Sequence, residues 1–192
     1  MVDRTARHPG LLSAEQSLLL VIDVQTRLLS AMADSDAQEV TANTVKLLAA
    51  AETLAIPVLL TEQYPQGLGA SHADIAHAMP DAARCFAKTA FSCCGAEGLI
   101  AALQVSARSQ VVLTGQEAHV CVLQTALELL AAGYAVFVVE DGVCSRSARH
   151  KDNALARLRQ AGVVIVNYES VLFEWLQDAR HPQFKTLSAL LR

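Results

Sequence analysis

Leu18-Leu-Leu-Val-Ile-Asp23 is an apolar run of strand length that ends at an acidic residue. Such continuous runs are typical of strands buried on both faces of a parallel sheet. Similar short runs occupy residues 58–61, 85–88, 110–114, 134–139 and 163–166, and stretches with helical patterning separate them. Alternating strands and helices joined by right-handed crossovers form a doubly wound sheet between two helical layers. The sequence therefore predicts an α/β fold, a three-layer α-β-α arrangement with a mainly parallel, Rossmann-like, six-stranded sheet.

The length of 192 residues suits one domain of ordinary size. No internal repeat, low-complexity tract or linker interrupts the strand–helix alternation. We therefore expect a single domain over residues 1–192. Within it, residues 1–12 are expected to form an N-terminal extension and residues 177–192 a C-terminal helical tail.

Composition argues against several classes of partner. The formal net charge is −4, and the basic residues form no stripe with interleaved aromatics, so nucleic acid is not an expected partner. No apolar run approaches the roughly 20 residues that a membrane-spanning helix needs. Hydrophobic residues nevertheless make up 53% of the chain, much of it Ala and Leu in helical patterns. This surplus favours subunit-facing surface, and hence a homo-oligomer, either a dimer or a tetramer.

Cysteine usage and the N-terminus both favour a cytoplasmic protein. The chain contains an odd number of cysteines without a regular framework: Cys85, Cys93, Cys94, Cys121 and Cys144. Such a set is typical of reduced thiols rather than disulfides. Residues 1–10 mix charged residues with proline and lack the apolar core of a secretory signal.

Ligands of doubly wound sheets bind beyond the carboxyl ends of the strands. The residues at those ends are Asp23, Glu62, Lys88, Gly115 and Asp141, the last placed where strand 134–139 is expected to stop. No strand is followed by the glycine-rich fingerprints that bind dinucleotides or triphosphates. We therefore expect a small-molecule substrate and no nucleotide cofactor.

Three residues at or after these strand ends could support catalysis, although each has a simpler explanation. Asp23 could cap the following helix, Lys88 could be a solvated strand-end lysine, and Cys121 could pack as a small hydrophobe. Cys121 lies in Gly115-Gln-Glu-Ala-His-Val-Cys121, where a helix is expected to begin. Helix N-termini lower thiol pKa values, so an exposed Cys121 with a low pKa is the functional alternative.

Together these positions resemble the isochorismatase-like cysteine hydrolases. The matching segments are Asp23-Val-Gln25, Lys88-Thr-Ala-Phe-Ser92 and Gly115 to Val122, and the resemblance extends over about residues 18–176. It implies that Asp23 takes a proton from the nucleophile Cys121 while Lys88 stabilises the anion. It also implies a thioester intermediate, cleavage of a small amide or other C–N bond, and no cofactor. The backbone N–H groups of Glu117 and Cys121 would form the oxyanion hole beside a cis Gln116–Glu117 peptide bond.

The loop Thr61 to Gly69 resembles the corresponding loop of family members whose substrates are unassigned. Nicotinamidases of the family carry an Asp-x-His element in the matching stretch, which this chain lacks, so no metal is expected. The residues expected to line the substrate pocket are Gln25, Leu28, Glu62, Gln63, Tyr64, Phe91 and Gln116.

Two other functions remain open at this point. One is vinyl-ether cleavage of the isochorismatase type, although members of the family with that activity replace the nucleophilic cysteine. The other is a non-catalytic binding or redox-sensing protein that uses an activated thiol.

Overall fold

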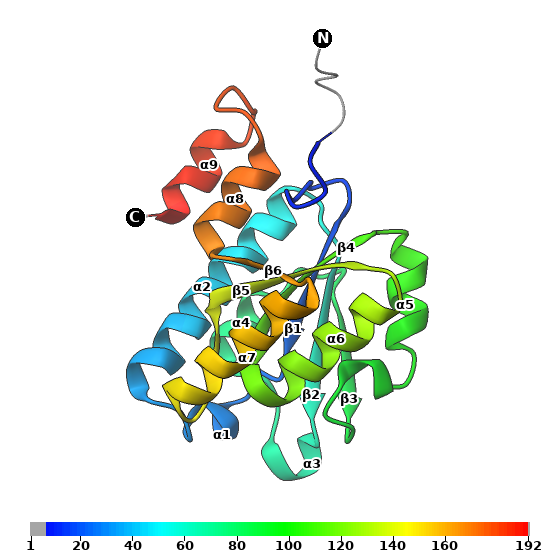
Figure 1. The fold of residues 1–192 in the computed structure, drawn as a ribbon. Helices are drawn as coiled ribbons and strands as arrows, with labels where there is room; N and C mark the ends of the chain where they lie inside the picture. The colour runs from blue at the N-terminus through cyan, green and yellow to red at the C-terminus, as the bar shows by residue number, and fades with distance from the viewer. Residues whose placement is uncertain (1–6, 192) are drawn as a thin grey trace.

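All six strands form one parallel sheet in the computed structural model, which describes residues 7–191. The strand order is β3-β2-β1-β4-β5-β6. Strands β1 to β3 are therefore added toward one edge of the sheet and strands β4 to β6 toward the other, and the switch lies between β1 and β4. The bounds are β1 Ser17–Ile22, β2 Val58–Gln63, β3 Arg84–Lys88, β4 Gln110–Gln116, β5 Ala135–Cys144 and β6 Val164–Val166. The predicted Rossmann-like α/β fold is confirmed (Figure 1).

Helices cover both faces of this sheet (Figure 1). The long helices are α2 Asp34–Thr53, α5 Leu99–Ser106, α6 Leu123–Ala131, α7 Ala148–Ala161 and α8 Tyr168–Leu176. Shorter ones are α1 Thr26–Leu29, α3 Pro65–Leu68, α4 Ala73–Ala78 and α9 Phe184–Ser188. Single turns occupy Cys93–Gly95, Ala118–Val122 and Ala189–Leu191. None of the helices within residues 7–191 is long and apolar enough to cross a membrane.

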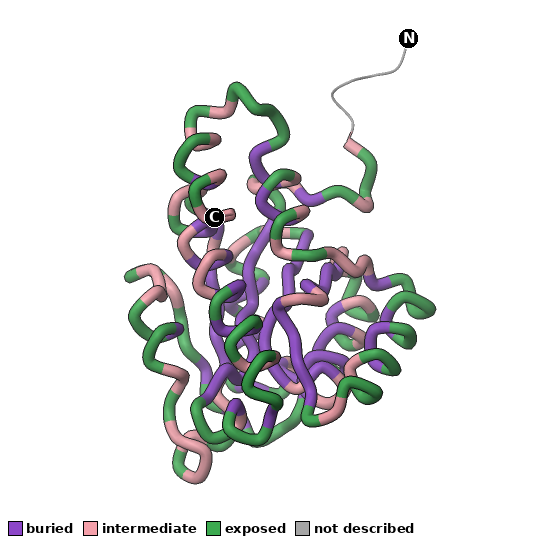
Figure 2. The backbone as a smooth tube through the Cα atoms, turned by 90° about the vertical axis from the view of Figure 1, so that its left-hand side faces the viewer, coloured by how far each residue is buried: buried purple, intermediate pink, exposed green. Residues whose placement is uncertain are grey.

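Strand β1 shows why both faces must be covered. Leu18 and Leu20 pack into a core with α5, α6 and α7, whereas Leu19 and Val21 pack into a second core with α2 and α8. Successive strand residues point to opposite faces, so an uninterrupted apolar run serves both cores. Figure 2 shows the strands as a buried centre between partly exposed helices.

The segment before β1 packs against α8, in the same core as α9. Leu12 is buried, and its backbone N–H donates to the Glu174 carboxylate on α8 at 2.7 Å. In the C-terminal tail, Leu187 of α9 is buried in the same core as α8. Residues 1–6 of the expected N-terminal extension and residue 192 of the expected tail lie outside the described residues.

Strand β5 is longer than the sequence analysis predicted. It continues through Asp141 and Gly142 to Cys144 after a register shift against β4. The Asp141 carboxylate accepts a hydrogen bond from the Tyr168 backbone N–H at 2.8 Å and so fixes the start of α8. The expectation that Asp141 ends this strand is therefore wrong, because the register shift lets β5 pair with β4 again at Val143 and Cys144.

Candidate active site

Gly115 allows β4 and β1 to approach closely where the chain direction reverses. A Cβ atom at this position would lie 1.9 Å from the Ile22 carbonyl oxygen, and the backbone φ of +118° also favours glycine. The close approach brings the segment after β4 beside Asp23 at the end of β1. The site therefore lies at the topological switch point, where doubly wound folds bind ligands.

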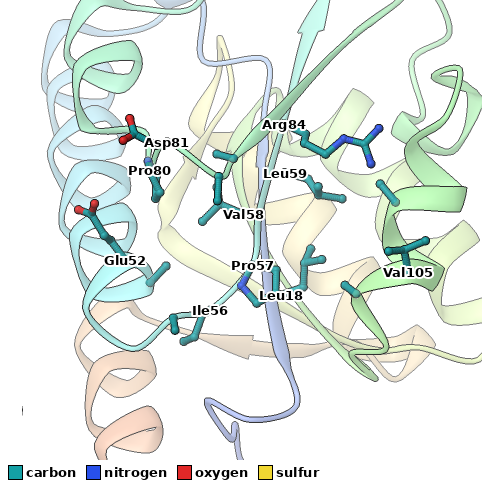
Figure 3. Close-up of a pocket in the computed structure, with 16 residues that line it drawn as sticks. Leu18, Glu52, Ile56, Pro57, Val58, Leu59, Pro80, Asp81, Arg84 and Val105 are labelled. Carbon is teal, nitrogen blue, oxygen red and sulfur yellow. The ribbon is translucent and has the colours of Figure 1, made fainter.

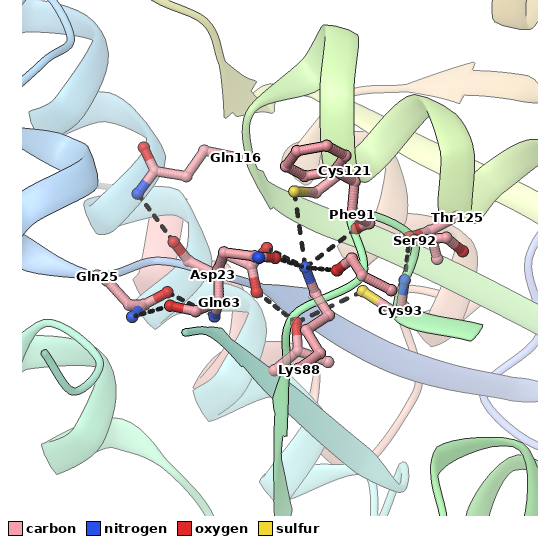
Figure 4. Close-up of polar contacts among 12 residues, drawn as sticks. Asp23, Gln25, Gln63, Lys88, Phe91, Ser92, Cys93, Gln116, Cys121 and Thr125 are labelled. Atoms are coloured by element: carbon pink, nitrogen blue, oxygen red, sulfur yellow. Dashed lines mark hydrogen bonds and ion pairs between the residues drawn. The ribbon is translucent and has the colours of Figure 1, made fainter. Parts of the chain in front are cut away.

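Asp23, Lys88 and Cys121 meet at this point (Figure 4). The Lys88 Nζ lies 2.7 Å from Asp23 Oδ2 and 3.6 Å from Cys121 Sγ. Both charged side chains are fully buried. The structure thus brings together the three residues that the sequence analysis selected from separate strands.

Other groups fix the positions of the charged pair. Thr61 donates its hydroxyl to Asp23 Oδ1 at 2.8 Å, and Gln116 Nε2 donates to the Asp23 backbone carbonyl at 3.0 Å. Lys88 also donates to Gln63 Oε1 at 2.5 Å and to the Phe91 carbonyl at 3.0 Å. Within residues 7–191, the Lys88 ammonium is the nearest charged partner of Asp23 Oδ2, and this oxygen accepts no conventional N–H or O–H hydrogen bond from another residue. This oxygen can therefore accept a proton from a nearby donor.

Cys121 differs from its expected state. It lies in a π-helical turn, Ala118–Val122, rather than in the first turn of an α-helix, and it is only 6% exposed. Burial raises the pKa of the thiol to about 12, the negative charge of Asp23 and a hydrogen bond to it act in the same direction, and Lys88 opposes them. The expectation of an exposed thiol with a low pKa is wrong, because the thiol is buried and lies beside the negative charge of Asp23. The resting thiol is protonated, so it needs a base before it can attack.

The peptide bond between Gln116 and Glu117 is cis, as the family resemblance implied. Glu117 is held by Arg146, whose backbone N–H and Nε donate to Glu117 Oε2 at 3.1 and 3.0 Å. Both Glu117 and Cys121 border the cavity described next.

A cavity of about 620 Å³ opens onto Cys121. Of the expected pocket residues, Leu28, Gln63, Tyr64 and Phe91 line it. The sequence analysis did not select Leu68, Thr89, Val120 and Arg146 or the Glu117 side chain, which also line it. Val120 and Arg146 carry no distinctive signal in the sequence, because they reach the cavity only through the folding of the segments after β4 and β5.

Three expected pocket residues need correction, since they do not line the cavity. Gln25 is buried and holds the loop after β2, donating to the Gln63 and Gly69 carbonyls and accepting from the Gln63 N–H. Glu62 accepts hydrogen bonds from the Ser71 backbone and hydroxyl. Gln116 is buried against Asp23 and Cys144. These three side chains support the site from behind because their polar atoms are engaged by the protein.

A second cavity, of about 550 Å³, lies at the opposite ends of the strands (Figure 3). It is bordered by Leu18, Val58 and Arg84, which begin or nearly begin β1, β2 and β3, and by Val105 of α5. Its wall is largely apolar and includes neither the buried ion pair nor the thiol. Within residues 7–191, no group of three or more His, Cys, Asp or Glu side chains is arranged to hold a metal ion.

Comparison with known proteins agrees with this geometry. The isochorismatase domain family model matches residues 17–170. Isochorismatase domain-containing protein 2 of Danio rerio is 38% identical over 187 residues, which cover 95% of this chain and 90% of the relative. The MAR1 ribonuclease of Caenorhabditis elegans has a similar structure, with a TM-score of 0.88, 33% identity and coverage of 94% and 92%. YcaC of Pseudomonas aeruginosa, solved with hexane-2,5-diol and covalent acrylamide, gives a TM-score of 0.89 at 26% identity, with coverage of 97% and 92%.

Proposed function

Because this chain belongs to the isochorismatase family of hydrolases, we propose that it cleaves a C–N bond of a small amide through a thioester on Cys121. The observation that carries the proposal is the buried contact of Lys88 Nζ with both Asp23 Oδ2 and Cys121 Sγ, at 2.7 and 3.6 Å. A carboxylate, an ammonium and a thiol in contact at a cavity wall can activate a nucleophile without a cofactor.

The first half of the reaction follows from the positions of these groups. Asp23 Oδ2 takes the thiol proton while Sγ bonds to the substrate carbonyl carbon, and the carbonyl electrons move onto its oxygen. Lys88 stabilises the negative charge that develops on the sulfur as the proton leaves. The backbone N–H groups of Glu117 and Cys121 are the proposed donors to the oxyanion. When the tetrahedral adduct collapses, the C–N bond breaks and nitrogen leaves as ammonia or an amine with the proton held by Asp23.

The second half regenerates the enzyme with the same groups. Water attacks the thioester carbonyl, and Asp23 accepts a proton from that water. The C–S bond then breaks, the carboxylic acid product leaves, and the thiolate recovers its proton from Asp23. The thiol and the carboxylate are thus returned to their starting states, and no oxidant or metal is consumed.

The covalent acrylamide on Pseudomonas aeruginosa YcaC supports a nucleophile in that related protein. A ribonuclease activity, which the name of the Caenorhabditis elegans neighbour states for that protein, is less suited to this site. Binding of phosphodiesters depends on cations that contact phosphate, whereas Lys88 and Arg146 are each paired with a carboxylate. Redox sensing is also less suited, because sensor thiols are accessible and have low pKa values.

Trapping the acyl-enzyme tests the proposed function. Incubation with small amides should release ammonia and add the acyl mass to the Cys121 peptide in an acid-quenched sample. Cys121→Ala should abolish both signals while remaining folded. Cys85→Ala is the matched control, because Cys85 is an exposed thiol on edge strand β3. Ammonia release by Cys121→Ala at the wild-type rate would refute the thioester mechanism.

We also propose that the protein is a cytoplasmic homo-oligomer, either a dimer or a tetramer. The five cysteines are all free, which suits a reducing compartment. Edge strand β3 has an exposed outer side at Arg84 and Cys85 beside the second cavity, and Val105 at that cavity is 83% exposed. Light scattering at micromolar concentration should give a multiple of 20.5 kDa, and Val105→Glu should lower it. A monomeric wild-type mass would refute this proposal.

A further inference from the structure

Two oppositely charged pairs lie at the catalytic cavity. Lys88 and Asp23 form one buried pair at 2.7 Å. Arg146 and Glu117 form a second pair at 3.0 Å on the cavity wall, where the Glu117 side chain is only 11% exposed. Among the described lining residues, no cation is left without a carboxylate partner. A charged substrate would therefore meet no opposite charge on this wall that is free of an existing partner.

The accessible wall of the same cavity is mostly apolar. Leu28, Leu68 and Val120 contribute aliphatic surface, and Tyr64 and Phe91 are 51% and 56% exposed at the cavity. Large aromatic side chains left this exposed beside a reactive group indicate surface that a ligand covers. An apolar ligand would remove this surface from water.

The amide side chain of Gln63 on this wall is already engaged by the protein. Gln63 uses Oε1 to accept from Lys88 and Nε2 to donate to the Thr89 carbonyl at 2.8 Å. Substrate polar groups that lose water without gaining partners weaken binding, and an unpaired buried charge weakens it most. Recognition on this wall therefore depends mainly on the reacting carbonyl and on apolar contact.

We propose that the cavity takes an uncharged amide with an apolar alkyl or aryl body, a statement of substrate class that rests on the proposed function. The amide carbonyl lies at Cys121, and the apolar body lies against Leu28, Tyr64 and Phe91. Anionic substrates, including dicarboxylates and nucleic acid phosphates, are disfavoured because Arg146, the cation on this wall, is already paired with Glu117. Each added methylene of the body should raise kcat/KM up to about fourfold until the cavity of about 620 Å³ is filled.

Alkylating reagents of matched shape test the substrate class without requiring turnover. N-Butyl iodoacetamide is compared with its 3-carboxypropyl and 3-aminopropyl analogues, and the rate at the Cys121 peptide is divided by the rate with N-acetylcysteine. The neutral reagent should be favoured by at least about 100-fold over the anionic one, since a carboxylate would be buried unpaired. Equal or faster labelling by the anionic reagent would overturn the proposal.

Glu117→Gln tests the role of charge pairing. The variant removes the wall carboxylate and leaves Arg146 unpaired, so the disadvantage of the anionic reagent should shrink by about tenfold. An unchanged ratio in the folded variant would overturn the argument from paired charges. If the variant does not fold, the wild-type reagent series decides alone.

A panel of primary amides separates this inference from the proposed function. Hexanamide should be hydrolysed faster than 6-aminohexanamide or the half-amide of adipic acid. If amides are hydrolysed but the charged ones are preferred, the inference fails and the proposed function stands. If no amide yields ammonia while the alkylation series keeps its neutral preference, the proposed function fails and the cavity still selects uncharged apolar ligands.

Discussion

Lys88→Met is expected to lower the free energy of unfolding by about 3–5 kcal/mol, because it leaves the Asp23 carboxylate buried without its partner. Both side chains of this pair are fully buried, so water cannot replace the ammonium at Oδ2. For a chain of this length the loss corresponds to a fall in Tm of roughly 6–20 °C. Urea unfolding followed by circular dichroism measures the first quantity, and calorimetry measures the second.

The double variant Asp23→Asn/Lys88→Met separates the charge effect from loss of packing. It removes both charges, so it should be more stable than Lys88→Met alone, although it should remain inactive. Lys185→Met is the surface control, because Lys185 is exposed on α9 and its replacement should change stability by less than about 0.5 kcal/mol. If Lys88→Met were as stable as the wild type, the ion pair would not be structurally important, and the double variant would show no recovery.

The strand pattern predicts the fold and places Asp23 and Lys88 at one edge of the sheet, whereas the choice of Asp23, Lys88 and Cys121 as a catalytic set comes from the resemblance to the isochorismatase-like hydrolases. Buried parallel strands appear as continuous apolar runs, and the residues that end such strands lie at one edge of the sheet. Asp23 and Lys88 follow or end strands whose carboxyl ends can be predicted from the sequence. Cys121 is identified as a nucleophile only through the family resemblance of the segment Gly115 to Val122, since a cysteine in an apolar helix carries little information alone.

Properties that depend on long-range packing could not be predicted in the same way. The exposure of Cys121 depends on how the π-helical turn packs against the core. Because this packing buries the thiol, its pKa is raised and the expectation of a low pKa is wrong. The cavity wall shows the same limit, because Gln25 and Glu62 are close in sequence to residues that line it. Their side chains instead bind backbone groups of neighbouring segments.

Asp23→Asn is expected to lower kcat/KM by about 10²–10⁴-fold at pH 7, the range attributed to a general base. Burial and the charge of Asp23 raise the pKa of the Cys121 thiol, so the thiolate is only a minor species at pH 7. In the proposed mechanism Asp23 therefore removes the proton as the thiol attacks. Asparagine has nearly the same shape but cannot accept this proton.

The pH profile distinguishes a base from a residue that only positions the thiol. The variant must rely on spontaneous ionisation, which increases tenfold for each pH unit below the thiol pKa. Removing the Asp23 charge lowers that pKa, but burial, its largest cause, remains. Between pH 7 and 9 the variant's kcat/KM should therefore rise steeply, while that of the wild type stays nearly flat. Asp178→Asn, at an exposed surface pair, should keep the wild-type profile. Parallel profiles for Asp23→Asn and the wild type would show that the carboxylate is not the base, because a positioning residue lowers the rate equally at every pH.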